Sequence, residues 1–390
     1  MRIGRFCLLM ALLALAPEAR AQAPEQLVDV SNTAGLSSSP AAVIDQAGTL
    51  HIAWSDSDSS TNLADQFVLY TRSHDGGATF DQPRRISSPD GAARRSARLV
   101  RVAVSSSGAI VLAWWDTTFD GSNRAYDTAF VSLSRDGGAT FGPPADTTLR
   151  FRADVAQKEG YTNLTSLSVA TGPGGQVYLL ATVQDYYHGF NIYFARSADG
   201  SQFAEPVRLT NYSGTIPRAA ANALALLPAG EIYAVWTESN GDFVDEIKNN
   251  YFASSTDGGR SFSAPMRVGG ARGVAGAILA RGGDVRLLTQ FQNGPRANHR
   301  IRLYTSEDRG RSFPTRAATG VAASNSHLNQ SSIADNGHGT VAVAWVENSS
   351  RPGPPAATTR RTVDKALLLN LADPLANAVA LARRAEAAGV

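Results

Sequence analysis

The chain has 390 residues, of which 18% are charged and 43% hydrophobic, and its formal net charge is +2. This near-neutral balance excludes the strong positive charge of proteins that bind nucleic acid through its phosphates. Cys7 is the only cysteine, so no intramolecular disulfide can form and packing must stabilise the fold.

The first 21 residues predict a secretory signal peptide. Two arginines precede an apolar run from Phe6 to Ala16, and Ala19 and Ala21 form a small-residue cleavage pattern. The run is about half the roughly 20 residues that a membrane span requires. Without the signal, 33 of the 36 basic and 33 of the 34 acidic residues remain. We therefore expect an exported protein, periplasmic or extracellular, with no membrane span and no nucleic-acid partner.

Five copies of a Ser-x-Asp-x-Gly-x-x-Phe motif follow, one of them a residue shorter. Their aspartates are 61, 63, 58 and 51 residues apart, which leaves room for one four-stranded unit per copy. The motif residues are Ser73, Asp75, Gly77 and Phe80; Ser134, Asp136, Gly138 and Phe141; Ser197, Asp199 and Phe203; Ser255, Asp257, Gly259 and Phe262; and Ser306, Asp308, Gly310 and Phe313.

Each unit predicts three strands, the motif and a fourth strand, which together form an antiparallel meander. In the first unit the expected strands are residues 40–45, 48–54, 67–72 and 83–87, where apolar and polar residues alternate in the second and third. A tryptophan follows a turn glycine by six positions in four units, and we expect it to pack between sheets. These tryptophans are Trp54, Trp114, Trp236 and Trp345.

The sixth unit ends in a decayed motif at Asp373 and has no clear fourth strand, whereas residues 24–30 resemble a fourth strand without a unit. We therefore expect an all-β, six-bladed propeller in which the N-terminal strand completes the last blade and removes open edges. The predicted divisions are a signal peptide at 1–21, a propeller domain at 22–374 and an alanine-rich tail at 375–390.

The motif has a structural explanation. Glycine permits positive φ in a tight turn, and serine and aspartate accept hydrogen bonds from its backbone amides. Each copy offers a single carboxylate, whereas calcium prefers several oxygen ligands, so we expect no metal and no cofactor.

These motifs, the Tyr/Phe-x-x-Ser runs before them and the upstream tryptophans resemble the Asp-box or BNR repeats of the sialidase superfamily. The resemblance covers essentially the whole chain after the signal. It implies a six-bladed propeller whose boxes lie on the face opposite the active site. It does not by itself imply catalysis, because one fold hosts many functions.

In a sialidase, three arginines clamp the substrate carboxylate, a tyrosine paired with a glutamate is the nucleophile, and an aspartate is the acid/base. Ser38 stands where the first arginine would be. The second unit has Arg98 at that position, and Arg218 and Arg272 lie near the first strands of later units.

The other catalytic positions match less well. Asp120 is the candidate acid/base, with Asp116 and Asp127 in the same segment, and Glu238 is a candidate carboxylate. The expected tyrosine of the last blade is absent, since no tyrosine follows Tyr304.

Two functions remain open. The first is a non-catalytic or catalytically unassigned module that binds a glycan or protein on the face opposite the boxes, with Trp115, Tyr186 and Tyr187 as ligand contacts. The alternative is an exo-α-sialidase-like glycoside hydrolase acting on terminal sialic acid or a related acidic sugar. We expect a monomer in either case.

Overall fold

The computed structural model describes residues 30–31, 33, 35, 37–57, 66–87, 96–119, 125–152, 163–185, 189–212, 218–240, 247–269, 273–291, 299–314, 319–324, 327–335, 340–348 and 362–370. All regular secondary structure in these ranges is β-strand. No helix that could cross a membrane occurs among them.

The strands form antiparallel meanders in chain order. The first contains β1 (Ser38–Ile44), β2 (Leu50–Ser57), β3 (Gln66–Ser73) and β4 (Arg84–Arg85). The second contains β5 (Arg98–Val104), β6 (Ile110–Phe119), β7 (Ala125–Ser134) and β8 (Ala145–Arg152). The third contains β9 (Asn163–Thr171), β10 (Val177–Asp185), β11 (Gly189–Ser197) and β12 (Val207–Arg208).

The remaining meanders follow the same plan. The fourth contains β13 (Arg218–Leu226), β14 (Ile232–Asn240), β15 (Ile247–Ser255) and β16 (Met266–Val268). The fifth contains β17 (Gly273–Arg281), β18 (Asp284–Phe291), β19 (His299–Ser306) and β20 (Thr319–Ser324). The last has three strands, β21 (His327–Asp335), β22 (Thr340–Asn348) and β23 (Thr362–Asn370).

Hydrogen bonding joins these meanders into five sheets among the described residues. The third and fourth meanders share one eight-stranded sheet because Phe190 of β11 pairs in parallel with Arg218 of β13. The all-β class and the four-stranded meanders are confirmed, whereas the count of six blades stays a prediction. The N-terminal strand expected at residues 24–30, Asp373 and the tail at 375–390 lie outside the described residues, apart from Val30.

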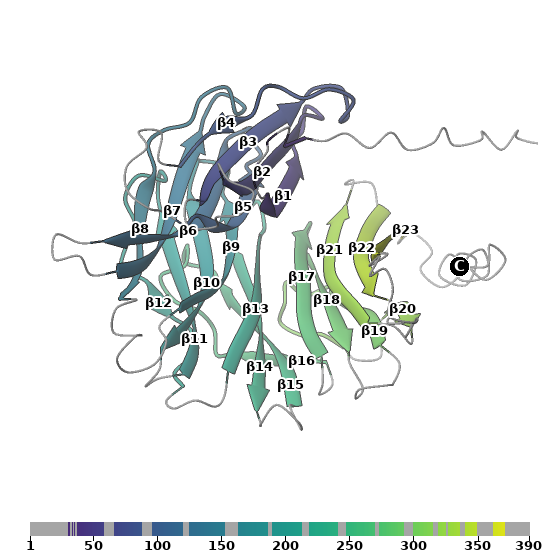
Figure 1. Ribbon diagram of the computed structural model, residues 1–390. Helices are drawn as coiled ribbons and strands as arrows, with labels where there is room; N and C mark the ends of the chain where they lie inside the picture. The colour runs from purple at the N-terminus through teal and green to yellow at the C-terminus, as the bar shows by residue number, and fades with distance from the viewer. Residues whose placement is uncertain are drawn as a thin grey trace, which may run out of the picture.

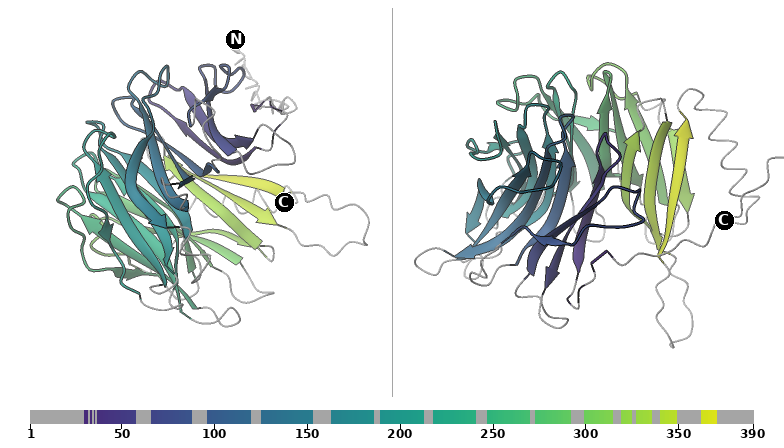
Figure 2. Two further views of the ribbon diagram at one scale, coloured as in Figure 1. Left: turned by 60° about the vertical axis from the view of Figure 1, so that its left-hand side comes forward. Right: turned by 90° about the horizontal axis from the view of Figure 1, so that it is seen from above.

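The first strand of each meander lies nearest the centre of the molecule, and the last strand lies at the periphery (Figure 1). Successive first strands contact one another in the order β1, β5, β9, β13, β17 and β21. Figure 2 shows the sheets packed around this centre in two further views. The first strands therefore form the wall around the central axis.

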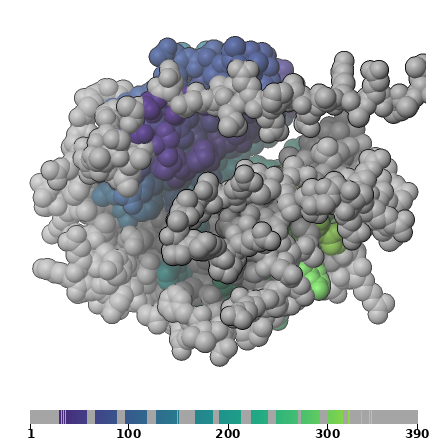
Figure 3. All heavy atoms as spheres, turned by 45° about the vertical axis from the view of Figure 1, so that its right-hand side comes forward, coloured from purple at the N-terminus to yellow at the C-terminus, as the bar shows by residue number. Residues whose placement is uncertain are grey.

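Apolar side chains on the strands pack between neighbouring sheets. One buried cluster joins Tyr70 of β3 to Val100 of β5 and Trp114 of β6. Trp54, Trp114 and Trp236 are all buried, as expected for residues between sheets. The first sheet remains accessible on one side, since Ile44 is 64% exposed and the purple segment forms part of the surface in Figure 3.

The Asp boxes are turns closed by their own side chains. In the second meander the Ser134 hydroxyl donates to Asp136 Oδ1 over 2.7 Å and accepts from the Gly138 amide over 2.8 Å. Thr140 donates to both carboxylate oxygens of Asp136, from its amide over 2.8 Å and its hydroxyl over 2.6 Å. These bonds, that of the Thr140 hydroxyl foremost, hold the pKa of Asp136 well below its usual range.

In three cases the box also packs against the meander before it. Phe141 meets Tyr70 edge to face with ring centroids 4.8 Å apart. Phe262 and Phe313 make the same contact with Phe194 and Phe252. In these cases the aromatic residue of the Tyr/Phe-x-x-Ser run is thus the receptor for the phenylalanine of the next box.

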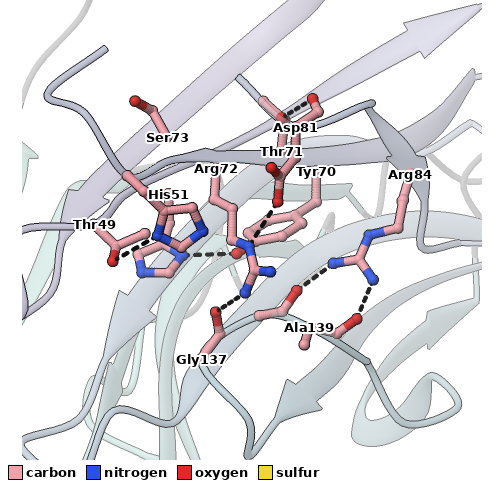
Figure 4. A network of polar contacts seen from close by, with 12 residues as sticks. Thr49, His51, Tyr70, Thr71, Arg72, Ser73, Asp81, Arg84, Gly137 and Ala139 are labelled. Carbon is pink, nitrogen blue, oxygen red and sulfur yellow. Dashed lines mark hydrogen bonds and ion pairs between the residues drawn. The ribbon is translucent and has the colours of Figure 1, made fainter. Parts of the chain in front are cut away.

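Polar contacts reinforce this boundary between the first and second meanders (Figure 4). Arg72 donates to the Gly137 carbonyl oxygen over 2.7 Å, and Arg84 donates to the carbonyl oxygens of Gly138 and Ala139. A hydrogen bond of 2.7 Å joins His51 Nδ1 to the Tyr70 hydroxyl. The box face is therefore bound by side chains of the preceding meander.

Candidate functional site

The face opposite the boxes is formed by the ends of the second strands. The third strands of the first five meanders each run into a box, as β3 does at Ser73, and each second strand is antiparallel to the third. The second strands therefore end on the opposite face. Four of them carry a carboxylate near that end, two residues after the tryptophan: Asp56, Asp116, Glu238 and Glu347.

Glu238, a predicted catalytic carboxylate, is 6% exposed. Its Oε1 accepts a hydrogen bond of 2.7 Å from the Trp236 indole. Burial, followed by hydrogen bonding to Glu238, raises the pKa of Tyr212, so the phenol stays protonated. Glu238 is thus held by two aromatic donors.

Asp56 occupies the matching position in the first meander. Its Oδ2 accepts from the Trp54 indole over 2.8 Å, the Thr33 hydroxyl over 2.9 Å and the Ser37 hydroxyl over 2.8 Å. It therefore anchors the segment before β1. The Trp-x-Asp/Glu spacing is visible in the sequence but was not part of the sequence prediction.

Arg98 and Trp115, both predicted site residues, lie together. They are partners across the β5–β6 pair, and the exposed Arg98 guanidinium lies 5.6 Å from the centroid of the Trp115 ring. Arg98 Nε also donates to Gln66 Oε1 of the first meander over 3.3 Å. The side chain is thus held between two meanders with its charge accessible.

Asp127 of β7 completes this group. It is 3% exposed and accepts from the Thr117 hydroxyl over 3.2 Å. Burial raises its pKa, while the Thr117 hydrogen bond and the Arg98 charge act in the opposite direction. Below, the Arg98 site means Gln66, Arg98, Trp115 and Asp127. It combines a planar cation, an aromatic ring and a carboxyl whose pKa is raised, so that it keeps its proton to a higher pH than an ordinary aspartic acid does.

The backbone at this site is bulged. The β5–β6 register shifts between Arg98 and Arg101, and Leu99 between them has a φ of 52°. Ser39 has a φ of 51° in the corresponding bulge of β1. A bulky residue in the left-handed region is strained, and such strain persists where surrounding structure enforces it. The bulge carries Arg98 to the position over Trp115.

Arg218, another predicted residue, does not occupy the position in its own meander that Arg98 occupies. Arg218 begins β13 and pairs with Ser239, three residues after Trp236, whereas Arg98 pairs one residue after Trp114. Ala220 occupies the position in β13 that matches Arg98, because it pairs with Thr237. Asp120, Tyr186, Tyr187 and Arg272 lie outside the described residues, as does the side chain of Arg218. The described part of the chain contains no cluster of three or more potential metal ligands.

Comparison with solved structures finds this fold in several proteins. A protein of unknown function from Dyadobacter fermentans has a TM-score of 0.58 at 15% identity, covering 86% of this chain and 95% of its own. An α-L-arabinanase from Penicillium chrysogenum has a TM-score of 0.55 at 14% identity, covering 87% and 94%. A variant of NanB sialidase from Streptococcus pneumoniae has a TM-score of 0.56 at 9% identity, covering 89% and 70%.

No protein-family model matches the chain, and no curated protein matches it in sequence. The identities to the solved structures are low, so the likeness concerns the fold. At that level the resemblance to the sialidase superfamily is confirmed: the chain has the β-propeller fold shared by sialidases and arabinanases.

Proposed function

We propose that this protein is an exported propeller that binds a glycan on the face opposite the Asp boxes, at the Arg98 site. One observation carries the proposal: an exposed guanidinium lies on a tryptophan ring beside a buried carboxyl from the adjacent strand. Aromatic rings present large apolar faces, and a planar guanidinium pairs with hydroxyl or carboxylate oxygens. The group suits a polar ring compound.

The proposed architecture is a closed ring of six blades whose last blade receives the strand at residues 24–30. The structures with the same fold support a glycan ligand, since they include an arabinanase complexed with arabinobiose and a trans-sialidase complexed with a sialic acid derivative. Those ligands belong to those proteins. For this chain they define the first compounds to test.

Glycoside hydrolysis is the second candidate, and the raised pKa of Asp127 favours it. A glycosidase needs one carboxyl that keeps its proton and donates it to the leaving oxygen. In this alternative Asp127 takes that role, Asp120 precedes it by seven residues in the sequence, and the reaction is exo-α-sialidase-like or acts on a related sugar.

Binding is tested by titrating the full chain with 3'-sialyllactose and arabinobiose in a calorimeter. Arg98→Ala and Trp115→Ala should each weaken binding by roughly tenfold or more, because each removes one side of the contact surface. Arg208→Ala is the matched control, since Arg208 lies over Tyr193 in a second cation–π pair at 5.9 Å. Equal binding by all four proteins would exclude the Arg98 site.

Catalysis is tested with fluorogenic α-sialosides and α-L-arabinofuranosides. Turnover that Asp127→Asn abolishes and Asp146→Asn leaves intact supports the hydrolase. Binding without turnover above a buffer blank supports the binding module.

A further inference from the structure

Arg101 on β5 is a cation in the wall around the central axis. Its Nε donates to the Leu167 carbonyl oxygen of β9 over 2.9 Å, and its Nη1 donates to the Val100 carbonyl oxygen over 2.9 Å. β5 and β9 are first strands that contact each other and end their hydrogen-bonded sheets. The side chain thus bridges two inner strands.

The positions that match Arg101 in the other meanders carry small side chains. Arg101 pairs with Ala113, the residue immediately before Trp114 on the second strand. In each other meander, one residue of the first strand pairs with the second-strand residue that matches Ala113. These residues are Ala41, Ser168, Ala223, Ala277 and Ser332. Arg101 is therefore a charged residue at a level of the wall where the other first strands carry alanine or serine.

Arg101 has no carboxylate partner among the described residues. Burial alone lowers its pKa, with no contribution from a neighbouring charge. An arginine stays protonated under these conditions, so a partly buried positive charge rests on two neutral carbonyl oxygens. A guanidinium has five N–H groups, and the bonds to Leu167 and Val100 use only Nε and one hydrogen of Nη1. The edge formed by Nη1 and Nη2 keeps donors for a ligand.

We propose that Arg101 is an anion-binding subsite between the inner strands β5 and β9, which takes a carboxylate or phosphate group on the outer edge of its guanidinium. Two parallel N–H donors match two oxygens of such a group, and an anion offsets the cost of the buried cation. This subsite differs from the Arg98 site. Arg101 lies on the other side of the β5 bulge from Arg98, and it contacts β9, whereas Arg98 contacts Trp115.

The test is calorimetric titration of the full chain with inorganic phosphate, and then with acetate and glucuronate as competitors. We expect saturable phosphate binding that Arg101→Gln weakens by roughly tenfold or more. Arg286→Gln is the control, since that arginine is paired with Asp284 at 3.0 Å, and its binding should equal the wild type. Competition by glucuronate indicates the carboxylate of an acidic sugar as the ligand, and competition by acetate alone indicates a free small anion.

Arg101→Lys provides a second measurement that also serves if Arg101→Gln does not fold. Lysine keeps the charge but loses the planar fork, so phosphate binding should persist and be weaker than in the wild type. Absence of saturable binding in the wild type, or equal affinity in wild type, Arg101→Gln and Arg101→Lys, would overturn the proposal. Because the probe is phosphate, the result is independent of glycan binding at Arg98.

Discussion

The indole nitrogen of Trp236 donates a 2.7 Å hydrogen bond to Glu238, two residues further along the same strand. The two side chains share one face of β14, since residues two apart on a strand point the same way. Trp54 and Asp56 repeat the contact at 2.8 Å in the first meander. Trp54 and Trp236, which fill space between sheets, thus have their polar nitrogens satisfied by a carboxylate near the strand end.

Removing that carboxylate should destabilise the fold. Glu238→Ala leaves the Trp236 indole and the Tyr212 hydroxyl without their acceptor, and we expect a loss of about 2–4 kcal/mol in the free energy of unfolding. Glu238→Gln should lose less, because its amide oxygen still accepts. Glu205→Ala, at an exposed position, is the control and should stay within about 0.5 kcal/mol of wild type. Urea unfolding measures all three, and equal losses for positions 205 and 238 would contradict the role of Glu238.

The second glycine of an Asp box should tolerate alanine less than the first. Gly137 and Gly138 both have positive φ, at 66° and 81°. A Cβ at position 137 meets open space, whereas one at 138 overlaps the Tyr70 ring and hydroxyl. Gly137→Ala should cost about 1–2 kcal/mol from backbone strain, and Gly138→Ala about 1–3 kcal/mol more from overpacking.

Tyr70→Phe provides the check on that cause. Removing the hydroxyl relieves part of the overlap, so Gly138→Ala should cost less in the Tyr70→Phe background than in the wild type. Thermal unfolding of the wild type, Gly138→Ala, Tyr70→Phe and the double variant gives the coupling energy between positions 70 and 138. If the two alanine variants have equal midpoints, contact with the preceding meander is not the reason for the glycine.

The box aspartates should contribute to stability above acidic pH. Hydrogen bonds, that of the Ser306 hydroxyl foremost, lower the pKa of Asp308 to about 2 from the ordinary 3.8. A carboxyl with a lowered folded-state pKa contributes stability that is present above the unfolded value and lost as pH falls through the folded one. The stability gap between wild type and Asp308→Asn should therefore be constant from about pH 5 to 8 and shrink between about pH 4 and 2. Denaturant unfolding across this range tests it, and a gap independent of pH would contradict it.

Asp127 should show the opposite dependence. Burial raises its pKa above 3.8, so the stability linked to its protonated form is present at low pH and lost as pH rises through the folded-state pKa. Asp127→Asn stays uncharged, and its stability relative to wild type should increase as pH rises from about 4 to 7. A flat difference for Asp127→Asn would place the carboxyl in a more polar setting than the one described.

Local motifs made much of the fold predictable from sequence. Each strand of the first meander was expected within three residues of its observed bounds, because alternating residues and box turns mark where strands begin and end. The burial of Trp54, Trp114 and Trp236 followed from the same register. The partner of each box phenylalanine was not predictable, since Phe141 packs on Tyr70 across a boundary that no local pattern marks.

The candidate site was less predictable because its members meet across strands. Arg98 and Trp115 were both expected, yet their contact depends on the β5–β6 register and its bulge. Asp127 joins them from β7, opposite Thr117, which required the pairing of two strands to be known. Arg218 was placed by counting from the repeat, and its pairing with Ser239 shows an offset of two residues from the Arg98 position.

The contact between an Asp box and the preceding meander has an evolutionary consequence. Phe262 and Gly259 need a flat ring beneath them, and Phe194 of the previous repeat supplies it. Suppose a gene duplication copied one sheet alone. Its box would then meet the aromatic ring of a different preceding sheet, and its own ring would meet a different following box, so both contacts would form only if those neighbours matched. The unit that must be copied intact therefore does not coincide with one sheet. It contains the aromatic ring of one repeat and the box of the next, and a duplication that keeps these two together preserves their contact.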